Sequence, residues 1–438
     1  MSIAYGGIVA FLFRGVNVLV ALATVLVTSR LLGKDDYGVL FLGLVVIGVV
    51  TAMTGGLTAA IAYQISNQRQ PSGTALLSGG VPGLLAGALA VGAGIFGTEA
   101  LTGEVQVLSL AVGIGAAAVV VQGVVAGVFL GKDSLVRYNI TLVLPPFLSL
   151  VCMVVVLVVL GHRTPESALA AYAVGQWAAA GVLLAMAGSD VRNVLTFNRS
   201  MMSAIISFAV LGSISSGISF LNYRADTFVV RHFEGDGGVG VYAIALYVGE
   251  SVWQVSGSLA LAIYGRIGTL TRDDAAVLVT RVMRHTLVII FAVCVCIFLG
   301  AGLVERAVSG RTPYPGVASA IRFLLPGVLL YSLAPTYSAF YTYQRGLPWV
   351  AAFVAGGGLI IDISLDFVLI PRMGVNGAAL ASTIAYAVAI LAGLAIFVAR
   401  ENIKAADIFR FGRADVEDYR VLIGRLRTLI GHPPAVQP

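Results

Sequence analysis

Two charged residues stand near the middle of long apolar segments. Arg14 is near the centre of 5–27, and Glu250 is near the centre of 239–264. An ionisable group at mid-bilayer costs roughly 2.5–3.5 kcal/mol on insertion scales, so it usually faces a cavity or a partner. A guanidinium suits phosphate oxygens, whereas a carboxylate suits a cation. With the polar residues near them, these charges predict a substrate site. The substrate-binding candidates are Arg14, Asn17, Arg224, Glu250 and Gln254.

Two aspartates form a second charged feature. Asp362 and Asp366 lie four residues apart in the apolar segment 348–370, so they share one face of a helix. They suit a cation or protons, but pairing with a neighbouring helix explains them equally well. The candidates for coupling transport to an ion are Glu250, Asp362 and Asp366.

Arg224 has a second interpretation. It directly follows the apolar segment 202–223, and Asp226 comes two residues later. Charged residues at the end of a span more often anchor it at the membrane interface than bind a ligand. This interpretation places Arg224 and Asp226 at the outer mouth of that span.

Apolar segments dominate the chain that carries these charges. Hydrophobic residues make up 58% of its 438 residues and charged residues 11%, against about 25% charged residues in soluble domains. A helix needs about 20 mostly apolar residues to cross the bilayer, where backbone groups must pair internally. The sequence therefore predicts an all-α membrane bundle of about twelve helices. The predicted spans are 5–27, 39–62, 75–97, 105–130, 140–160, 167–187, 202–223, 239–264, 285–304, 318–343, 348–370 and 375–398.

No cofactor or metal site is predicted. The three cysteines, Cys152, Cys294 and Cys296, all fall within spans, where we expect them to pack as small hydrophobes. The stretch 235–240 matches the dinucleotide-binding glycine pattern, but it joins two spans and follows no strand. We interpret its glycines as a flexible turn.

The basic residues predict the orientation. Of the 27 Lys and Arg residues, 17 lie on one side of the predicted spans, 8 on the other and two within spans. Because cytoplasmic loops carry the excess, both termini are expected in the cytoplasm of a multi-pass plasma membrane protein. The first span is expected to be retained, since no Lys or Arg precedes it and Arg14 lies inside it. The net charge of +6 is thus a topology signal, and no nucleic-acid partner is predicted.

The chain repeats itself weakly. The sequence from Arg30 to Val39 is echoed at 231–241, and Ala168-Leu-Ala170 recurs as Ala379-Leu-Ala381. These offsets of 202 and 211 residues predict two six-helix lobes in parallel orientation, with the substrate between them. The predicted divisions are an N-terminal lobe 1–187, a cytoplasmic linker 188–200, a C-terminal lobe 201–399 and a basic cytoplasmic tail 400–438, amphipathic from Val416.

The repeat bears on whether Arg14 and Glu250 form a site or a structural pair. The offset carries Arg14 to about Ser215 and Glu250 to about Gly48, so neither charge is duplicated. A role in the architecture would more naturally be duplicated. A buried Arg14–Glu250 pair that only holds the lobes in register nevertheless stays open beside a polar site that contacts cargo or a coupling ion.

Several motifs resemble the polysaccharide transporter (oligosaccharide flippase) family of the multidrug/oligosaccharidyl-lipid/polysaccharide exporter superfamily. They are the turn from Arg30-Leu-Leu-Gly33 to Tyr37-Gly38, Ser309-Gly310-Arg-Thr-Pro-Tyr314, Ile321 to Gly327, Tyr343-Gln344-Arg345-Gly346, and Leu369-Ile370-Pro371 to Ala381. Each motif is loose, and the overall pattern runs from Tyr5 to Arg400.

The resemblance implies a MATE-like fold of two lobes around a central cleft, with alternating access. It implies as cargo a polyprenyl-phosphate- or diphosphate-linked oligosaccharide, moved to the outer leaflet for assembly of surface polysaccharide or glycoprotein glycans. Membrane lipids, H+ or Na+ as coupling ion, and glycan-assembly enzymes are the further partners that it suggests.

Two other functions compete. A multidrug or organic-cation antiporter of the same superfamily needs carboxylates in its cleft, where a phosphate carrier needs arginine. Arg14 favours the flippase, whereas Glu250, Asp362 and Asp366 keep the antiporter open. A membrane enzyme of glycan assembly would usually present long extramembrane loops with catalytic carboxylates. The longest predicted connection, Arg266 to Arg284, is about 20 residues, so we expect no enzyme.

Overall fold

The regular structure is helical throughout the part of the chain that the computed structural model describes, which is residues 3–102, 107–191, 195–267, 269–401, 403–410, 412 and 415. The first half forms α1 (Ile3–Leu32), α2 (Lys34–Ser66), α3 (Ser72–Thr102), α4 (Val107–Gly131), α5 (Leu135–Val154), the π-helical turn η1 (Val155–Val159) and α6 (Pro165–Val191). The predicted tail helix from Val416 lies outside the described residues.

The second half forms α7 (Arg199–Ser251), α8 (Trp253–Ile267), α9 (Arg272–Val308), α10 (Val317–Tyr331), α11 (Ala334–Ala339), the π-helical turn η2 (Phe340–Gln344), α12 (Pro348–Met373), α13 (Val375–Glu401) and the short α14 (Ala405–Phe409). Local sequence explains several of these boundaries. Asn198 caps α7 by accepting a hydrogen bond from the Met201 N–H at 3.0 Å, and Thr271 caps α9 in the same way. Gly33, with a φ of 92°, separates α1 from α2.

Eleven helices in the described residues are long and apolar enough to cross a membrane, and one of them covers two predicted spans. The segment 199–260 is not straight, because Gly235 has a φ of 66° and a non-helical ψ. Arg224 and Glu250 are 26 residues apart, which would separate them by about 39 Å along a straight helix, yet their side chains are hydrogen-bonded. The chain therefore folds back at Gly235. An all-α polytopic membrane protein of about twelve spans is confirmed.

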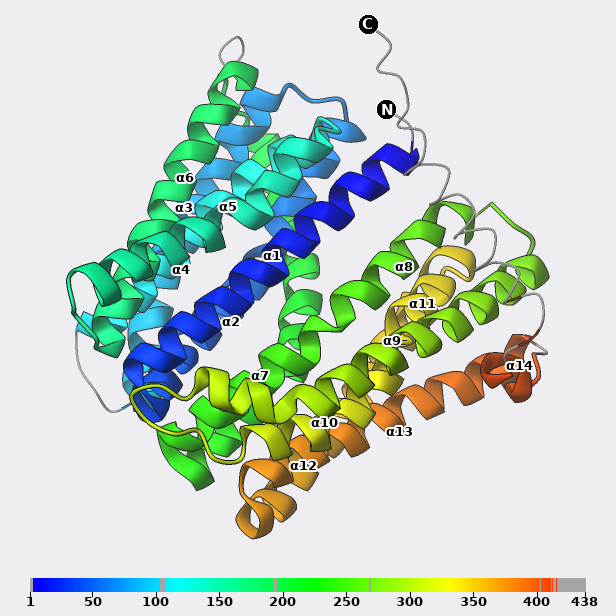
Figure 1. Cartoon of the computed structure of the whole chain (residues 1–438). Helices are drawn as coiled ribbons and strands as arrows, with labels where there is room; N and C mark the ends of the chain where they lie inside the picture. The colour runs from blue at the N-terminus through cyan, green and yellow to red at the C-terminus, as the bar shows by residue number, and fades with distance from the viewer. Residues whose placement is uncertain are drawn as a thin grey trace, which may run out of the picture.

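The helices of the two halves lie side by side, and α2 packs along α7 (Figure 1). Glycines allow this close approach. A Cβ atom on Gly56 would lie 2.0 Å from the Ala209 carbonyl oxygen, and one on Gly38 would lie 1.9 Å from that of Asp236. Side chains at these positions would push α2 and α7 apart. The predicted lobe boundaries stay a prediction.

The end of the bundle that holds Gly33 and Gly235, here called the turn end, is tightly closed. A Cβ atom on Gly240 would lie 2.1 Å from the Lys34 carbonyl oxygen. In addition, the 309–316 loop between α9 and α10 binds the turn between α1 and α2 through three hydrogen bonds. They run from the Arg311 N–H to the Arg30 oxygen (2.9 Å), from the Lys34 N–H to Thr312 Oγ1 (2.8 Å), and from the Tyr314 hydroxyl to the Ser29 oxygen (2.9 Å).

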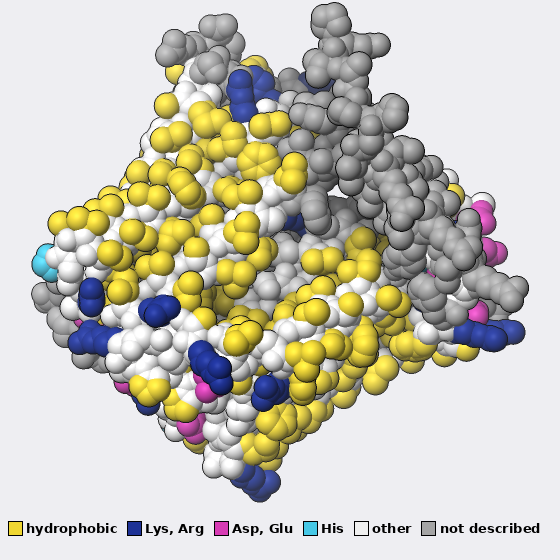
Figure 2. All heavy atoms as spheres, viewed as in Figure 1, with side chains coloured by type: hydrophobic (Ala, Val, Ile, Leu, Met, Phe, Trp, Pro, Cys, Tyr) yellow, Lys and Arg dark blue, Asp and Glu magenta, His cyan; other side chains and the backbone are white. Residues whose placement is uncertain are grey.

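The outer surface is suited to lipid. Figure 2 shows hydrophobic side chains spread over both halves, whereas Lys and Arg gather mainly along the lower edge of the view, where the turn end lies. Leu89, Leu299 and Phe353 are each about three-quarters exposed. Such large exposed apolar faces would be unfavourable in water and favourable in a bilayer. The chain is a multi-pass membrane protein.

Candidate functional site

Glu250 forms a bidentate ion pair with Arg224. Nη1 donates to Oε1 and Nη2 donates to Oε2, both at 2.7 Å. Each side chain is 16% exposed. The fold-back at Gly235 brings the two residues together on one chain segment. The Arg14–Glu250 pair that was open from the sequence is therefore not the pair that forms, because Arg224 already occupies both carboxylate oxygens.

The position of Arg224 corrects the interpretation of it as an interfacial anchor. The helix does not end at 223 but continues for twelve more residues to the kink at Gly235. At ~1.5 Å per residue this places Arg224 about 16 Å from the kink, within the helix and not at its end. Asp226 is likewise buried. The charged residues that suggested a helix end are instead internal groups that face partners.

Arg14 has a different environment from Arg224. It is half-buried on α1 and forms no ion pair or hydrogen bond with any residue that the structure describes. Its Nη1 atom lies 3.3 Å from the position that a Cβ atom would take at Gly257 of α8. Gly257 is seven residues, or about two helical turns, beyond Glu250. Arg14 therefore contacts α8 at a level about 10 Å away from Glu250. The absence of a side chain at Gly257 gives the guanidinium room.

The two amide candidates lie on the same elements. Asn17 is half-buried on α1, one turn after Arg14, and Gln254 is exposed on α8, one turn after Glu250. The helical hydrogen-bond ladder is interrupted between Glu250 and Gln254, where the Val252 N–H bonds to the Gly249 oxygen instead of the oxygen four residues back. Such irregular turns are often found at functional sites in membrane helices.

An aromatic cluster surrounds the Arg224–Glu250 pair. The hydroxyls of Tyr223 and Tyr331 are 3.2 Å apart, and Trp253 packs against Tyr331 and Tyr386 with ring centroids at 5.1 and 5.6 Å. The Trp253 indole N–H donates to the Val328 oxygen at 3.2 Å. These rings exclude water and strengthen the attraction between the paired charges. Sequence reasoning missed this cluster, because its members are scattered over α7, α8, α10 and α13.

A group of buried aspartates lies nearer the turn end. Asp226, Asp362 and Asp366 are at most 3% exposed. The Tyr242 hydroxyl donates to Asp226 Oδ2 at 2.5 Å and lies 3.1 Å from the Ser382 hydroxyl. Asp362 Oδ1 and both Asp366 oxygens have no hydrogen-bond partner among the described residues.

The aspartates do not pair with a basic residue of a neighbouring helix in the described chain. Asp362 is hydrogen-bonded to Ser382 of the neighbouring α13, so for Asp362 pairing with a neighbouring helix also stays open beside the cation or proton interpretation. Asp226, which sequence reasoning placed at the membrane interface, belongs with them. The described residues contain no group of three or more His, Cys, Asp or Glu side chains placed to hold a metal ion together. A monovalent cation would therefore need hydroxyl or carbonyl ligands as well.

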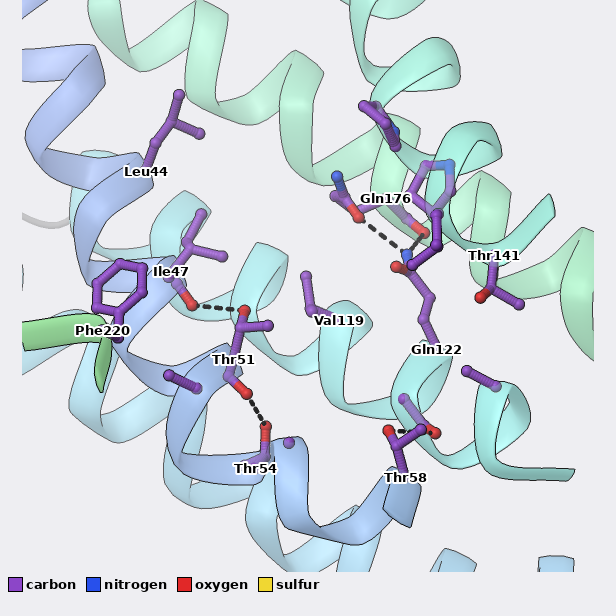
Figure 3. Close-up of a pocket in the computed structure, with 18 of the residues that line it drawn as sticks. Leu44, Ile47, Thr51, Thr54, Thr58, Val119, Gln122, Thr141, Gln176 and Phe220 are labelled. Atoms are coloured by element: carbon purple, nitrogen blue, oxygen red, sulfur yellow. Dashed lines mark hydrogen bonds between the residues drawn. The ribbon is translucent and has the colours of Figure 1, made fainter. Parts of the chain in front are cut away.

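A cavity of about 480 Å³ opens in the first half of the chain (Figure 3). Its walls come from α2, α4, α5 and α6, and Phe220 of α7 adds one side chain. Hydroxyl and amide side chains line it, including Thr51, Thr54 and Gln122. Sequence reasoning missed it because a search for buried charge passes over neutral polar residues. The threonines at 51, 54 and 58, which share one face of α2, were the available signal.

The sequence itself decides the family. A family model described as "polysaccharide biosynthesis protein" matches residues 27–312, well over half of the chain. The chain belongs to the polysaccharide biosynthesis protein family. The family expected from the sequence motifs is thus confirmed, although the match ends before the motifs that follow Tyr314. No curated protein matches this family member at a significant level.

Solved structures confirm the MATE-like fold of this polysaccharide biosynthesis protein. An inward-facing multidrug resistance MATE family transporter of the MOP superfamily is 17% identical, with a TM-score of 0.73 over 90% of this chain and 98% of that chain. The lipid II flippase MurJ in an inward closed conformation is 13% identical, with a TM-score of 0.70 over 98% and 97%. An outward-facing MATE transporter is 18% identical, with a TM-score of 0.62 over 90% and 94%. These solved structures, which share this fold, are two transporters and a flippase.

Proposed function

We propose that the protein is a flippase that moves a polyprenyl-phosphate- or diphosphate-linked oligosaccharide from the cytoplasmic to the outer leaflet, for assembly of surface polysaccharide or glycoprotein glycans. The observation that carries the proposal is Arg14, a half-buried guanidinium in a membrane helix with no partner in the described chain. An unpaired charge there is unfavourable unless something neutralises it in use. A phosphate does so, and the fork of N–H donors matches its oxygens.

The alternative is an organic-cation antiporter, which the MATE-like fold and the buried carboxylates favour. The structure weighs against it at two places. Glu250 is neutralised by Arg224, and the aspartates at 226, 362 and 366 are too deeply buried to meet a drug-sized cation without rearrangement. Among the charged candidates, Arg14 is the one that is neither paired nor fully buried in the described residues, and it is basic.

The function is tested by translocation in proteoliposomes. A fluorescent polyprenyl-diphosphate-linked oligosaccharide in the vesicle membrane is expected to become accessible on the opposite leaflet only when the protein is present. A fluorescent organic cation is the comparison substrate. Transport of the cation without movement of the lipid would establish the antiporter instead.

The proposed orientation places the turn end outside and both termini in the cytoplasm of the plasma membrane. With the turn end closed, the described state would then be open toward the cytoplasm, which is where a lipid-linked sugar is made before it is flipped. The higher structural similarity to the inward-facing than to the outward-facing MATE transporter, 0.73 against 0.62, agrees with this arrangement.

Replacement of Gly240 with alanine is expected to wedge the turn end open, because the new Cβ atom would overlap the Lys34 backbone. Leu40 of α2, which is 1% exposed, serves as the reporter of opening at the turn end. With native cysteines removed, Leu40→Cys should react slowly with an impermeant maleimide added outside cells, and roughly tenfold faster beside Gly240→Ala. Gly92→Ala, which has open space around it, is the control. Acceleration from the inner side alone would reverse the proposed orientation.

Replacement of Asp366 with asparagine is expected to uncouple transport from the driving ion. Both oxygens of this buried carboxylate lack partners in the described chain, so the group is available to a proton or a cation such as Na+. Flipping in proteoliposomes should respond to an imposed proton or sodium gradient in the parent and lose that response in Asp366→Asn. Exposed Asp273→Asn is the control. An unchanged gradient response in Asp366→Asn would exclude this residue from coupling.

A further inference from the structure

The cavity of the first half, here called the threonine cavity, contains no charged residue in its described lining. It measures about 480 Å³, within the range of roughly 300–1,000 Å³ that small-molecule sites occupy. A second cavity of about 230 Å³ lies next to it on the side of the turn end, since Leu44, Pro146 and Tyr172 line both. Neither cavity has a charged residue in its described lining, and each is lined mostly by the first half of the chain with one residue of α7, Phe220 or Tyr247.

The threonine hydroxyls that line the threonine cavity can act toward a ligand as hydrogen-bond acceptors. Thr51 donates to the Ile47 oxygen at 2.8 Å, Thr58 donates to the Gly123 oxygen at 2.9 Å, and Thr141 donates to the Tyr138 oxygen at 2.7 Å. Thr54 donates to backbone oxygens of its own helix, to that of Val50 at 2.9 Å and to that of Thr51 at 3.2 Å, the second of which Figure 3 shows. A hydroxyl has a single hydrogen and two lone pairs. Because these four hydrogens are committed to the backbone, the threonine hydroxyls offer only lone pairs to a ligand.

The amide groups in the wall are held in place by one another. Gln122 Nε2 donates to the backbone oxygen of Gln176 at 2.7 Å and to its Oε1 at 2.9 Å. Gln176 Nε2 in turn donates to the Ser149 hydroxyl at 3.2 Å. Both glutamines are buried, so this network holds α4, α5 and α6 in one arrangement. The polar groups of this wall are therefore held in place before a ligand binds.

The chemistry of the lining selects a class of ligand. A phosphate is itself an acceptor and would meet lone pairs with no basic side chain to neutralise it. An organic cation would find no carboxylate. A neutral molecule with many hydroxyl or amide N–H donors satisfies the acceptors, and apolar ring faces are offered to it by Tyr138, Tyr172 and Phe220. Uncharged sugars have this combination of donors and apolar faces.

We propose that the threonine cavity binds the uncharged sugar units of the lipid-linked oligosaccharide while Arg14 contacts its phosphate. This inference rests on the proposed function. α1 connects the two places, because it carries Arg14 and, ten residues further, Thr24 in the wall of the second cavity. That separation is about 15 Å along the helix. The phosphate and the sugars are thus recognised by different parts of the protein.

Phe220 relates the sugar site to the movement of the two halves. It belongs to α7 and lines a cavity that is otherwise built by α2, α4, α5 and α6. Its ring sits so close to Gly48 of α2 that a Cβ atom there would lie 2.4 Å from Cζ. Any movement of α7 against α2 therefore removes one wall of the sugar site. Alternating access would loosen the sugars as the halves rearrange.

The test compares two probes on the purified full-length protein in detergent. One is a fluorescent polyprenyl diphosphate that carries an uncharged N-acetylglucosamine disaccharide, and the other is the same lipid diphosphate without sugar. The disaccharide lipid is expected to bind roughly tenfold or more tightly in the parent. Thr51→Val combined with Thr141→Val should remove this difference, because each loses an acceptor at nearly constant shape. Affinity for the sugar-free lipid should not change.

Thr286→Val in α9 is the control, since this threonine is buried like Thr141 and donates to its own helix, at 2.8 Å to the Val282 oxygen, but does not line the cavity. This variant should keep the tenfold difference in affinity between the two probes. The double variant Thr51→Ser with Thr141→Ser should keep it as well, because serine retains the hydroxyl. Equal affinities for both probes in the parent, or an unchanged difference in the double valine variant, would overturn the sugar site. Failure of translocation in proteoliposomes, with the affinity difference intact, would instead count against the proposed function alone.

Discussion

Replacing Arg14 with alanine is expected to abolish flipping of the lipid-linked oligosaccharide at normal protein levels while the unfolding temperature stays nearly unchanged. Loss of one partner from a desolvated charge-assisted contact costs roughly 2–5 kcal/mol, a factor of about 30 to several thousand in affinity. Arg14 has no ion-pair partner in the described residues, so its removal leaves no opposite charge unpaired. The measurement is translocation in proteoliposomes beside thermal unfolding in detergent.

Two further variants sharpen this experiment. Arg14→Lys should keep part of the activity, because it retains the charge but not the planar fork of donors. Exposed Arg372→Ala is the control for loss of a positive charge. Since Glu250 pairs with Arg224, adding Glu250→Ala should not rescue Arg14→Ala. Full activity of Arg14→Ala, or its rescue by the second change, would remove Arg14 from the proposed phosphate site.

Separate replacement of Arg224 and Glu250 with alanine is expected to destabilise the protein strongly, by roughly 3–5 kcal/mol each. Either change leaves one largely buried charge without its partner between the two arms of α7 that meet at Gly235. The double variant should recover most of the lost stability, because it leaves no uncompensated charge. Thermal unfolding of the four proteins in one detergent measures this recovery.

The Arg231–Asp236 pair at the turn end is the matched control. Its atoms are also 2.7 Å apart, but its side chains are 18% and 33% exposed. Solvent screening should limit its single replacements to about 1 kcal/mol or less. The pair does not stabilise the fold-back if Arg224→Ala and Glu250→Ala lower the stability no more than the single replacements of Arg231 and Asp236 do. The same conclusion follows if the two losses of stability simply add in the double variant.

The spans were predictable because apolar length is a local property. The segment 375–398 appears as α13 and the segment 75–97 within α3, each with ends extended by a few residues. Helix ends that carry charge were less predictable. The span that begins at 202 runs on to Gly235, because Arg224 and Asp226 find partners inside the bundle and so need no water.

By itself, the sequence determined the class of the protein: an all-helical membrane bundle of a polysaccharide biosynthesis family, with Arg14, Glu250, Asp362 and Asp366 as its unusual charges. Only the tertiary structure decided which of these charges is neutralised. Arg224 reaches Glu250 because the chain reverses at Gly235, a contact over 26 residues that no periodicity encodes. The threonine cavity arises the same way, since the separation of α2, α4, α5 and α6, and not the polarity of any one helix, creates a neutral space between them.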